Sequence, residues 1–273
     1  MPPRKRSPAN ARQLSSPAYR LAALDQEFLL ADARRGLRFH LEYEKAEEAL
    51  RAWGIRSTIV VFGSARIREN GGSDHARWYK AARAFAAIAS ARGGAMDRDH
   101  DGQRDNVIAT GGGGGIMEAA NRGAADVGAP SIGFNIRLPA EQEPNAWSTP
   151  ELTFQFHYFA MRKMHFAMRT NGLVIFPGGF GTCDELFEML TLDQTGKGNH
   201  APIVLYDEAY WRAAINFQHF VDHGMISKED LSLFDYASSP EETWQKLLDR
   251  GLQATNGPLE KPRPRTRKKQ KAP

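Results

Sequence analysis

Two glycine-rich turns, each followed by acidic residues, are the parts of this sequence best suited to chemistry. The first lies in "VIATGGGGGIMEAANRGA" at residues 107–124, and the second in "VIFPGGFGTCDELFEML" at residues 174–190. In each, a short apolar run that predicts a buried strand passes through glycines into a segment with helical composition. A helix N-terminus presents unpaired backbone N–H groups and the positive end of the helix dipole. Each turn is therefore a candidate anion-binding site.

The glycines matter because a backbone without Cβ atoms can approach a phosphate closely. The candidate contacts are Gly112, Gly113 and Gly115 in the first turn and Gly178, Gly179 and Gly181 in the second. Thr182 is expected at the N-cap of the second helix, where its hydroxyl could cap the helix or donate to a phosphate oxygen. A tight turn without a ligand is the alternative for either turn alone. Two such turns in one sheet favour a ligand, because glycine costs backbone entropy.

Two common phosphate-binding patterns are missing. The P-loop pattern G-x-x-x-x-G-K-[ST] has no match, since "QTGKGN" at 194–199 has the lysine but neither the glycine spacing nor the hydroxyl. The dinucleotide pattern G-x-G-x-x-G fails in the first turn, where its last position would be Ile116, Met117 or Glu118. We therefore expect a mononucleotide or a sugar phosphate rather than ATP with magnesium or NAD.

Acidic and basic residues lie close to the second turn. Asp184 and Glu188 are acids at a helix start, where the helix dipole alone accounts for them, whereas Glu185 lies close enough to face a ligand. Upstream, Arg162 and Lys163 lie near the start of the preceding predicted helix, where cations oppose the dipole. An anion or a catalytic carboxylate nearby would account for these cations. A solvated basic face is the alternative.

Strands that alternate with helices must position these residues. The patterns predict strands within 57–66, 107–110, 131–135, 152–156, 172–176, 202–205 and 234–237, and helices over 75–92, 116–127, 158–171, 182–194, 208–222 and 240–252. Such alternation implies right-handed crossovers and a parallel sheet with helices on both faces. We predict an α/β fold, a Rossmann-like doubly wound parallel sheet in a single domain with an N-terminal helical extension. Its ligand would sit at the carboxyl ends of the strands, where the glycine turns lie.

The chain ends differ from this domain in composition. We expect disordered basic tails at 1–16 and 255–273, a helical extension at 17–53 and the nucleotide-binding domain at 54–254. The tails carry net charges of +4 and +6, which leaves −6 on the residues between them although the whole chain is +4. An acidic domain argues against a nucleic-acid partner. The tails are interpreted as solubilising segments, and non-specific contact with RNA or anionic surfaces is the alternative.

The composition also bears on the compartment. The single cysteine, Cys183, excludes internal disulfides and suits a reducing environment. No apolar run approaches the roughly 18 residues needed to cross a bilayer. The basic N-terminus has no apolar segment behind it and so does not read as a secretory signal. We expect a cytoplasmic protein without a membrane partner.

Several motifs, in order along the chain, resemble those of one known family. "PGGFGTCDE" at 177–185 matches the PGGxGTxxE signature of the LONELY GUY family, the cytokinin riboside 5′-monophosphate phosphoribohydrolases once mislabelled lysine decarboxylases. The segments "GGGGGIMEAANRGA", "LPAEQEPN", "YFAMRKMHF" and "LTLDQTGK" resemble its longer-chain bacterial branch, and the resemblance covers residues 55–210. It implies a Rossmann-like fold, a homo-oligomer, no metal or cofactor, and hydrolysis of the N-glycosidic bond of adenine-type nucleoside 5′-monophosphates. The implied products are a free base and ribose 5-phosphate.

The resemblance also assigns roles. Glu185 is similar to the catalytic carboxylate and Arg162 to its partner, which we expect to orient the carboxylate and keep it ionised. The residues that resemble the nucleotide-binding set are Glu141, Lys163, Gly178, Gly179, Gly181 and Thr182. Shorter members read M-H-x-R-K before the second turn, but this chain has no histidine there. Many relatives of the longer branch have proline where this chain has Gly114.

Two classes of function remain open at this point. The first is a hydrolase that acts on cytokinin riboside 5′-monophosphate, on AMP or on both. The second is a non-catalytic nucleotide or molybdenum-cofactor carrier of the same superfamily, which needs the glycine turns but not the acid–arginine pair. The presence of Arg162 and Glu185 in the expected motifs favours the enzyme.

Overall fold

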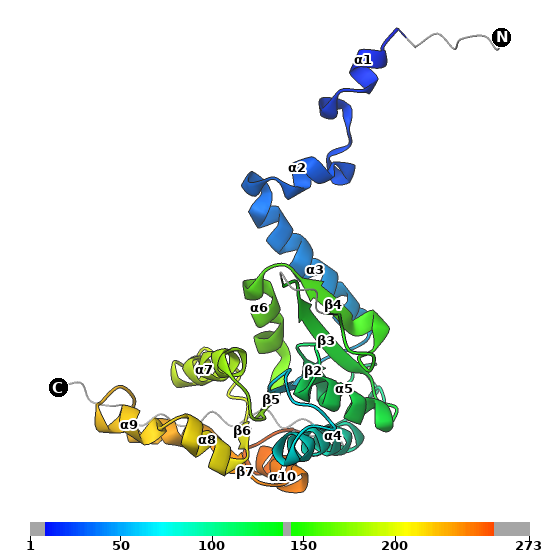
Figure 1. Ribbon diagram of the computed structural model, residues 1–273. Helices are drawn as coiled ribbons and strands as arrows, with labels where there is room; N and C mark the ends of the chain where they lie inside the picture. The colour runs from blue at the N-terminus through cyan, green and yellow to red at the C-terminus, as the bar shows by residue number, and fades with distance from the viewer. Residues whose placement is uncertain (1–8, 139–142, 254–273) are drawn as a thin grey trace. The chain divides into compact units, whose positions relative to one another are not determined.

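The N-terminal part of the chain is helical and forms a compact unit of its own. The computed structural model describes residues 9–138 and 143–253, and the chain divides into one unit that ends at Glu47 and another that begins at Glu48. The helices of the first unit are α1 (Ala11–Leu14), α2 (Gln26–Leu30) and most of α3 (Arg35–Ala52), joined by short 3-10 turns (Figure 1). None of the described residues before Ala46 is buried. Residues 1–8, 139–142 and 254–273 lie outside the described residues. They include Glu141, the whole tail predicted at 255–273 and the first eight residues of the tail predicted at 1–16.

The second unit is built around one parallel sheet of seven strands, as the sequence predicts. The strands are β1 (Thr58–Phe62), β2 (Val107–Thr110), β3 (Ser131–Ile136), β4 (Thr153–Phe156), β5 (Thr170–Ile175), β6 (Ile203–Tyr206) and β7 (Phe234–Ala237). They lie in the order β4-β3-β2-β1-β5-β6-β7, and every neighbouring pair is parallel. β1, β2 and β3 are buried along their whole length, as expected for strands covered on both faces.

Helices cover both faces of this sheet. They are α4 (Ser73–Arg92), α5 (Ile116–Asp126), α6 (Phe159–Arg169), α7 (Phe180–Gln194), α8 (Glu208–Ala214), α9 (Phe217–Asp222) and α10 (Pro240–Asp249). α4 contacts both α5 and α10 in one layer. α6 packs on the other face, where the ring of Phe166 contacts those of Phe62 and Phe134. No helix among the described residues is long and apolar enough to span a membrane.

One helix differs from its prediction. The segment predicted as a single helix over 208–222 is two helices, α8 and α9, with Ile215 and Asn216 between them. The side chain of Asn216 accepts a hydrogen bond from the backbone N–H of His219 at 3.1 Å and so caps α9. Because asparagine competes for backbone donors in this way, it begins a helix more readily than it continues one.

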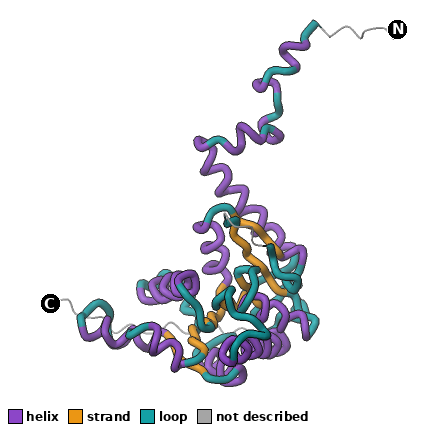
Figure 2. Tube along the Cα trace, in the orientation of Figure 1, coloured by secondary structure: helices purple, strands orange, loops and turns teal. Residues whose placement is uncertain are grey.

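The strand order places a topological switch point between β1 and β5. From β1 the chain runs outward through β2, β3 and β4, and after β5 it runs outward in the opposite direction. Ligands of open α/β sheets bind at such a switch point. The loop after β1 joins both glycine turns, because the N–H of Ser64 donates to the carbonyl of Pro177 at 3.0 Å and its carbonyl accepts from the N–H of Ile116 at 3.2 Å. Loops and helices surround the strands of the sheet (Figure 2).

Candidate active site

The second glycine turn begins α7 earlier than the sequence predicts. The carbonyl of Gly179 accepts hydrogen bonds from the N–H groups of Thr182 and Cys183 at 3.0 and 2.9 Å, so Gly179 is the N-cap and α7 starts at Phe180. The prediction of Thr182 as the N-cap is therefore wrong. Its buried hydroxyl instead faces Gly178, where an added Cβ would lie less than 3.0 Å from Thr182 Oγ1.

This turn presents unpaired backbone donors. Within the described part of the chain, no hydrogen bond uses the amides of residues 178–181 as donors. Gly179 and Gly181 are exposed, and no atom lies within 4 Å of the place where a Cβ would stand on either. Amides that face open space at the start of a 15-residue helix are suited to hold an anion.

The first glycine turn is buried and held by side chains. The amide of Asn145 donates to the carbonyls of Gly112 and Gly113 at 3.1 and 3.0 Å, and the N–H of Gly112 donates to Thr110 Oγ1 at 3.0 Å. Gly112 and Gly115 have φ angles of +70° and +68°, which side-chain-bearing residues rarely adopt. The first turn is thus held in one conformation beside the switch point.

Arg162 connects the two turns. Its Nε donates to the carbonyl of Phe134 at 2.8 Å, and a Cβ on Gly111 would lie less than 3.0 Å from its Nη2, so the guanidinium rests on the first turn. Its Nη1 lies 3.9 Å from Glu185 Oε1 on α7. Both side chains are largely buried, with 11% of Arg162 and 6% of Glu185 exposed. The two residues that the sequence singles out for chemistry therefore face each other.

Burial sets the protonation of this pair. Loss of solvent raises the pKa of Glu185 to about 7, although Arg162 and Lys163 act in the opposite direction. Burial also lowers the pKa of Arg162, again against the pull of Glu185. The expectation that Arg162 keeps Glu185 ionised holds only in part, because desolvation outweighs the guanidinium. A carboxyl group that titrates near neutral pH can give or take a proton during catalysis.

Lys163 has partners on α7. Its Nζ lies 2.8 Å from Asp184 Oδ2 and 3.4 Å from Glu188 Oε2. Because α7 begins at Phe180, these two acids lie beyond its first turn, and the pairing with Lys163 accounts for them better than the helix dipole does. The three charges tie α6 to α7 and fix the spacing between Arg162 and Glu185.

Two contributors to the site were not predicted. One is the loop after β1, where Ser64 bonds to both turns and where a Cβ on Gly63 would overlap the side chain of Ile116. The glycine at the end of the buried run "TIVVFG" could have indicated that this loop contributes to the site. The other is Asn145, whose amide fixes the first turn.

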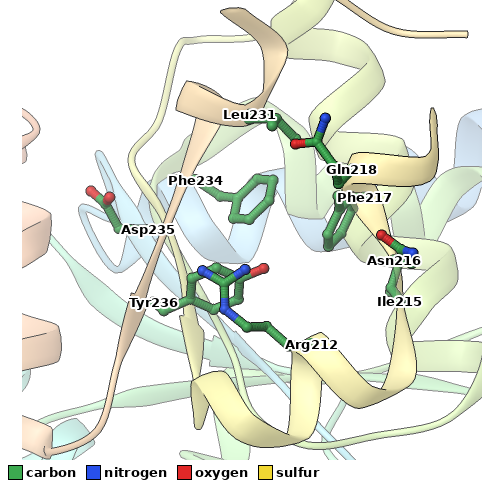
Figure 3. Close-up of a pocket in the computed structure, with 9 residues that line it drawn as sticks. All are labelled: Arg212, Ile215, Asn216, Phe217, Gln218, Leu231, Phe234, Asp235 and Tyr236. Atoms are coloured by element: carbon green, nitrogen blue, oxygen red, sulfur yellow. The ribbon is translucent and has the colours of Figure 1, made fainter. Parts of the chain in front are cut away.

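One cavity and one cluster of possible metal ligands lie apart from the two glycine turns. A cavity of about 300 Å³ lies between α8, α9 and β7, and contains none of the predicted site residues (Figure 3). Among the side chains that line the cavity, the rings of Phe217 and Phe234 have centroids 4.7 Å apart. The guanidinium of Arg212 lies over the ring of Tyr236. Among the described residues, one group could offer ligand atoms to a metal, namely Asp99, His100 and Asp101 on the loop before β2. Asp99 is already bound to Arg56 at 2.8 Å.

The parallel sheet, its switch point and the glycine turns define a Rossmann-like α/β protein. A family model described as "Possible lysine decarboxylase" matches residues 117–247. A probable cytokinin riboside 5′-monophosphate phosphoribohydrolase of Oryza sativa subsp. japonica is 25% identical over 53% of this chain and 63% of its own length. The cytokinin riboside 5′-monophosphate phosphoribohydrolase LOG1 of Arabidopsis thaliana is 32% identical over 32% of this chain and 42% of its own length. The family model and these relatives support assignment to the LONELY GUY family, and the chain spans less than two thirds of each of these relatives.

One solved structure follows a similar path of the backbone. The molybdenum cofactor binding protein of Rippkaea orientalis is 18% identical over 71% of this chain and 95% of its own, with a TM-score of 0.48. A likeness at this level carries no argument about function.

Proposed function

We propose that this chain hydrolyses the N-glycosidic bond of adenine-type nucleoside 5′-monophosphates, namely cytokinin riboside 5′-monophosphate, AMP or both. The observation that carries the proposal is the buried pair of Glu185 and Arg162, which lies beside a helix N-terminus with unpaired amides. The names of the two plant relatives agree with this reaction class. A carrier protein would need the amides but would have no use for a buried carboxyl group that titrates near neutral pH.

The 5′-phosphate would bind the amides of residues 178–181. Their N–H groups and the helix dipole favour an anion. A phosphate fixed at the start of α7 would place the ribose over the first two turns of this helix, and the second of these turns carries the buried Glu185. Binding energy from the phosphate, which does not react, then orients the bond that breaks.

Glu185 would act at the anomeric carbon. Cleavage of a ribosyl–base bond passes through an oxocarbenium-like state, as in glycoside hydrolysis. The ionised carboxylate can stabilise this positive charge and accept a proton from the attacking water. Water then supplies the hydroxyl of ribose 5-phosphate, the C1′–N9 bond breaks, and the base leaves with a proton. Arg162, held by the carbonyl of Phe134, keeps the carboxylate in place.

The test is base release by the full chain. The protein is incubated with AMP and with isopentenyladenosine monophosphate, and free base is followed by chromatography. The Glu185→Gln variant is expected to lose about a hundredfold to a thousandfold in rate, because one electrostatic contact at the reacting centre is worth that much, while it still binds nucleotide. The matched control is Glu118→Gln, which changes the acid that follows the first turn and accepts a hydrogen bond from Tyr79 at 3.2 Å.

The outcomes separate the two classes of function. Base release by the wild type and by Glu118→Gln, but not by Glu185→Gln, supports the hydrolase. Binding of nucleotide without release of base from either substrate would favour a carrier. A near-normal rate in Glu185→Gln would overturn the role of Glu185. The ratio of the two wild-type rates gives the base preference.

A further inference from the structure

The second glycine turn is held from behind by a tyrosine of α8. The hydroxyl of Tyr210 donates to the carbonyl of Gly178 at 2.8 Å. Its ring meets that of Trp78 edge to face, with the centroids 5.5 Å apart. Tyr210 lies in no motif noted above, and it follows Gly181, the last glycine of the second turn, by 29 residues.

Asp207 fixes the position of this tyrosine. It is buried at the N-cap of α8 and accepts hydrogen bonds from Trp78 Nε1 at 2.7 Å, from Arg77 at 2.7 Å and from the N–H of Tyr210 at 3.2 Å. Its φ of +73° is rare for a residue with a side chain. Such a conformation persists where surrounding bonds impose it, and here they hold Tyr210 in one place.

The bond to Gly178 determines where the next amide points. In a planar trans peptide the C=O of one residue and the N–H of the next point in opposite directions. The C=O of Gly178 points to Tyr210, so the N–H of Gly179 points away from α8. This N–H is one of the unpaired donors at the start of α7. The hydroxyl thus keeps a donor aimed at the place where an anion would bind.

We infer that Tyr210, clamped by Asp207 and Trp78, is a positioning residue for the phosphate of the substrate. This inference rests on the proposed function for the identity of the anion as a nucleotide phosphate. Without the hydroxyl, the peptide between Gly178 and Gly179 could rotate, and its N–H would be aimed correctly for only part of the time. Tyr210 need not touch the substrate to have this effect.

The test compares Tyr210→Phe with Tyr236→Phe in the full chain. Both variants remove one tyrosine hydroxyl and keep the ring, but Tyr236 lies in the remote cavity of Figure 3. Calorimetry measures the binding of AMP, of inorganic phosphate and of adenosine, which has no phosphate. Tyr210→Phe is expected to weaken AMP and phosphate about fivefold, the effect of one net hydrogen bond, and to leave adenosine unchanged. Tyr236→Phe should leave all three affinities unchanged.

A merely structural role predicts a different pattern. If Tyr210→Phe only loosened the fold, adenosine and AMP would weaken equally and the melting temperature would fall, and this result would overturn the inference. Unchanged AMP and phosphate affinities, or a wild type that binds neither, would overturn it as well. Because the readout is binding, a selective loss in a protein that releases no base would support the role of Tyr210 and contradict only the proposed hydrolysis.

Discussion

The two glycine turns share the order of strand, glycines and helix, but they need glycine for opposite reasons. In the first turn, Gly112 and Gly115 have positive φ angles, and an added Cβ would lie less than 3.0 Å from the amide of Asn135 or from the backbone around Ser64. In the second turn, Gly181 has no positive φ, and no atom lies within 4 Å of its Cβ position. The fold itself requires glycine at positions 112 and 115 of the first turn. In the second turn Gly178 is confined in the same way, but Gly179 and Gly181 face open space that a ligand can use.

The acids that follow the two turns also differ, in their burial and in their partners. Glu118 accepts a hydrogen bond from the hydroxyl of Tyr79 at 3.2 Å and is half-buried. Glu185 is buried beside Arg162, and the pKa of its carboxyl is raised to about 7 by desolvation. An ionisable group held at such a cost points to function more strongly than one that bonds to a neighbouring side chain. We therefore propose that the first turn is a scaffold and that the second carries the chemistry.

The largest effect is expected from an alanine in the first turn. Gly115→Ala forces a side chain into a φ of +68° and a ψ of −129°, with its Cβ against the carbonyl of Ser64. Strain and overpacking of this kind cost about 3 kcal/mol or more together. Urea unfolding should report a loss of that size. The matched control is Gly114→Ala, where the nearest atom lies 3.6 Å from the new Cβ and φ is not positive.

Equal stability of Gly115→Ala and Gly114→Ala would contradict the distinction between the two turns. A loss under about 1 kcal/mol in Gly115→Ala is within the range of ordinary surface changes and overpacking. The first turn would then be no more dependent on glycine than the second.

The next effect concerns pH and isolates the acid of the second turn. The pKa of Glu185 is about 7 in the folded chain, raised from 4.5, so the proton on this carboxyl stabilises the fold. Its contribution is complete below pH 4.5 and is lost as the pH rises through about 7. Glu185→Gln cannot lose a proton there. The free energy of unfolding of Glu185→Gln, relative to that of the wild type, should therefore rise by on the order of 3 kcal/mol between pH 4.5 and pH 8.

Urea unfolding of both proteins across this range measures the gain. A difference that stays constant with pH would mean that Glu185 titrates as an ordinary surface acid. The same titration predicts that the rate of base release rises with pH through about 7, since the ionised carboxylate is the active form.

Much of this architecture follows from local patterns in the sequence. β-branched runs such as "TIVVF" indicate buried strands, and strands that alternate with helices lead to the parallel sheet. The start of α7 was misplaced because the sequence shows a hydroxyl at Thr182, whereas the backbone carbonyl of Gly179 makes the capping bonds. Tyr210 and Asn145 could not be predicted from spacing. Each reaches its turn only through the tertiary fold, across 32 or 33 residues of sequence.

The smallest effect distinguishes the turns most directly. Gly181 is the second residue of α7, and Gly36 is the second residue of α3; neither has an atom within 4 Å of its Cβ position. Alanine at either position should leave stability unchanged or raise it by up to about 1 kcal/mol, because alanine favours helix over glycine. Side chains tilt toward the helix N-terminus, so a methyl group at 181 would enter the space for the phosphate. We expect Gly181→Ala to weaken AMP about tenfold, or about 1.4 kcal/mol, and Gly36→Ala to leave AMP affinity unchanged in the same calorimetric assay. Full AMP affinity in Gly181→Ala would mean that this open space is not where the phosphate binds.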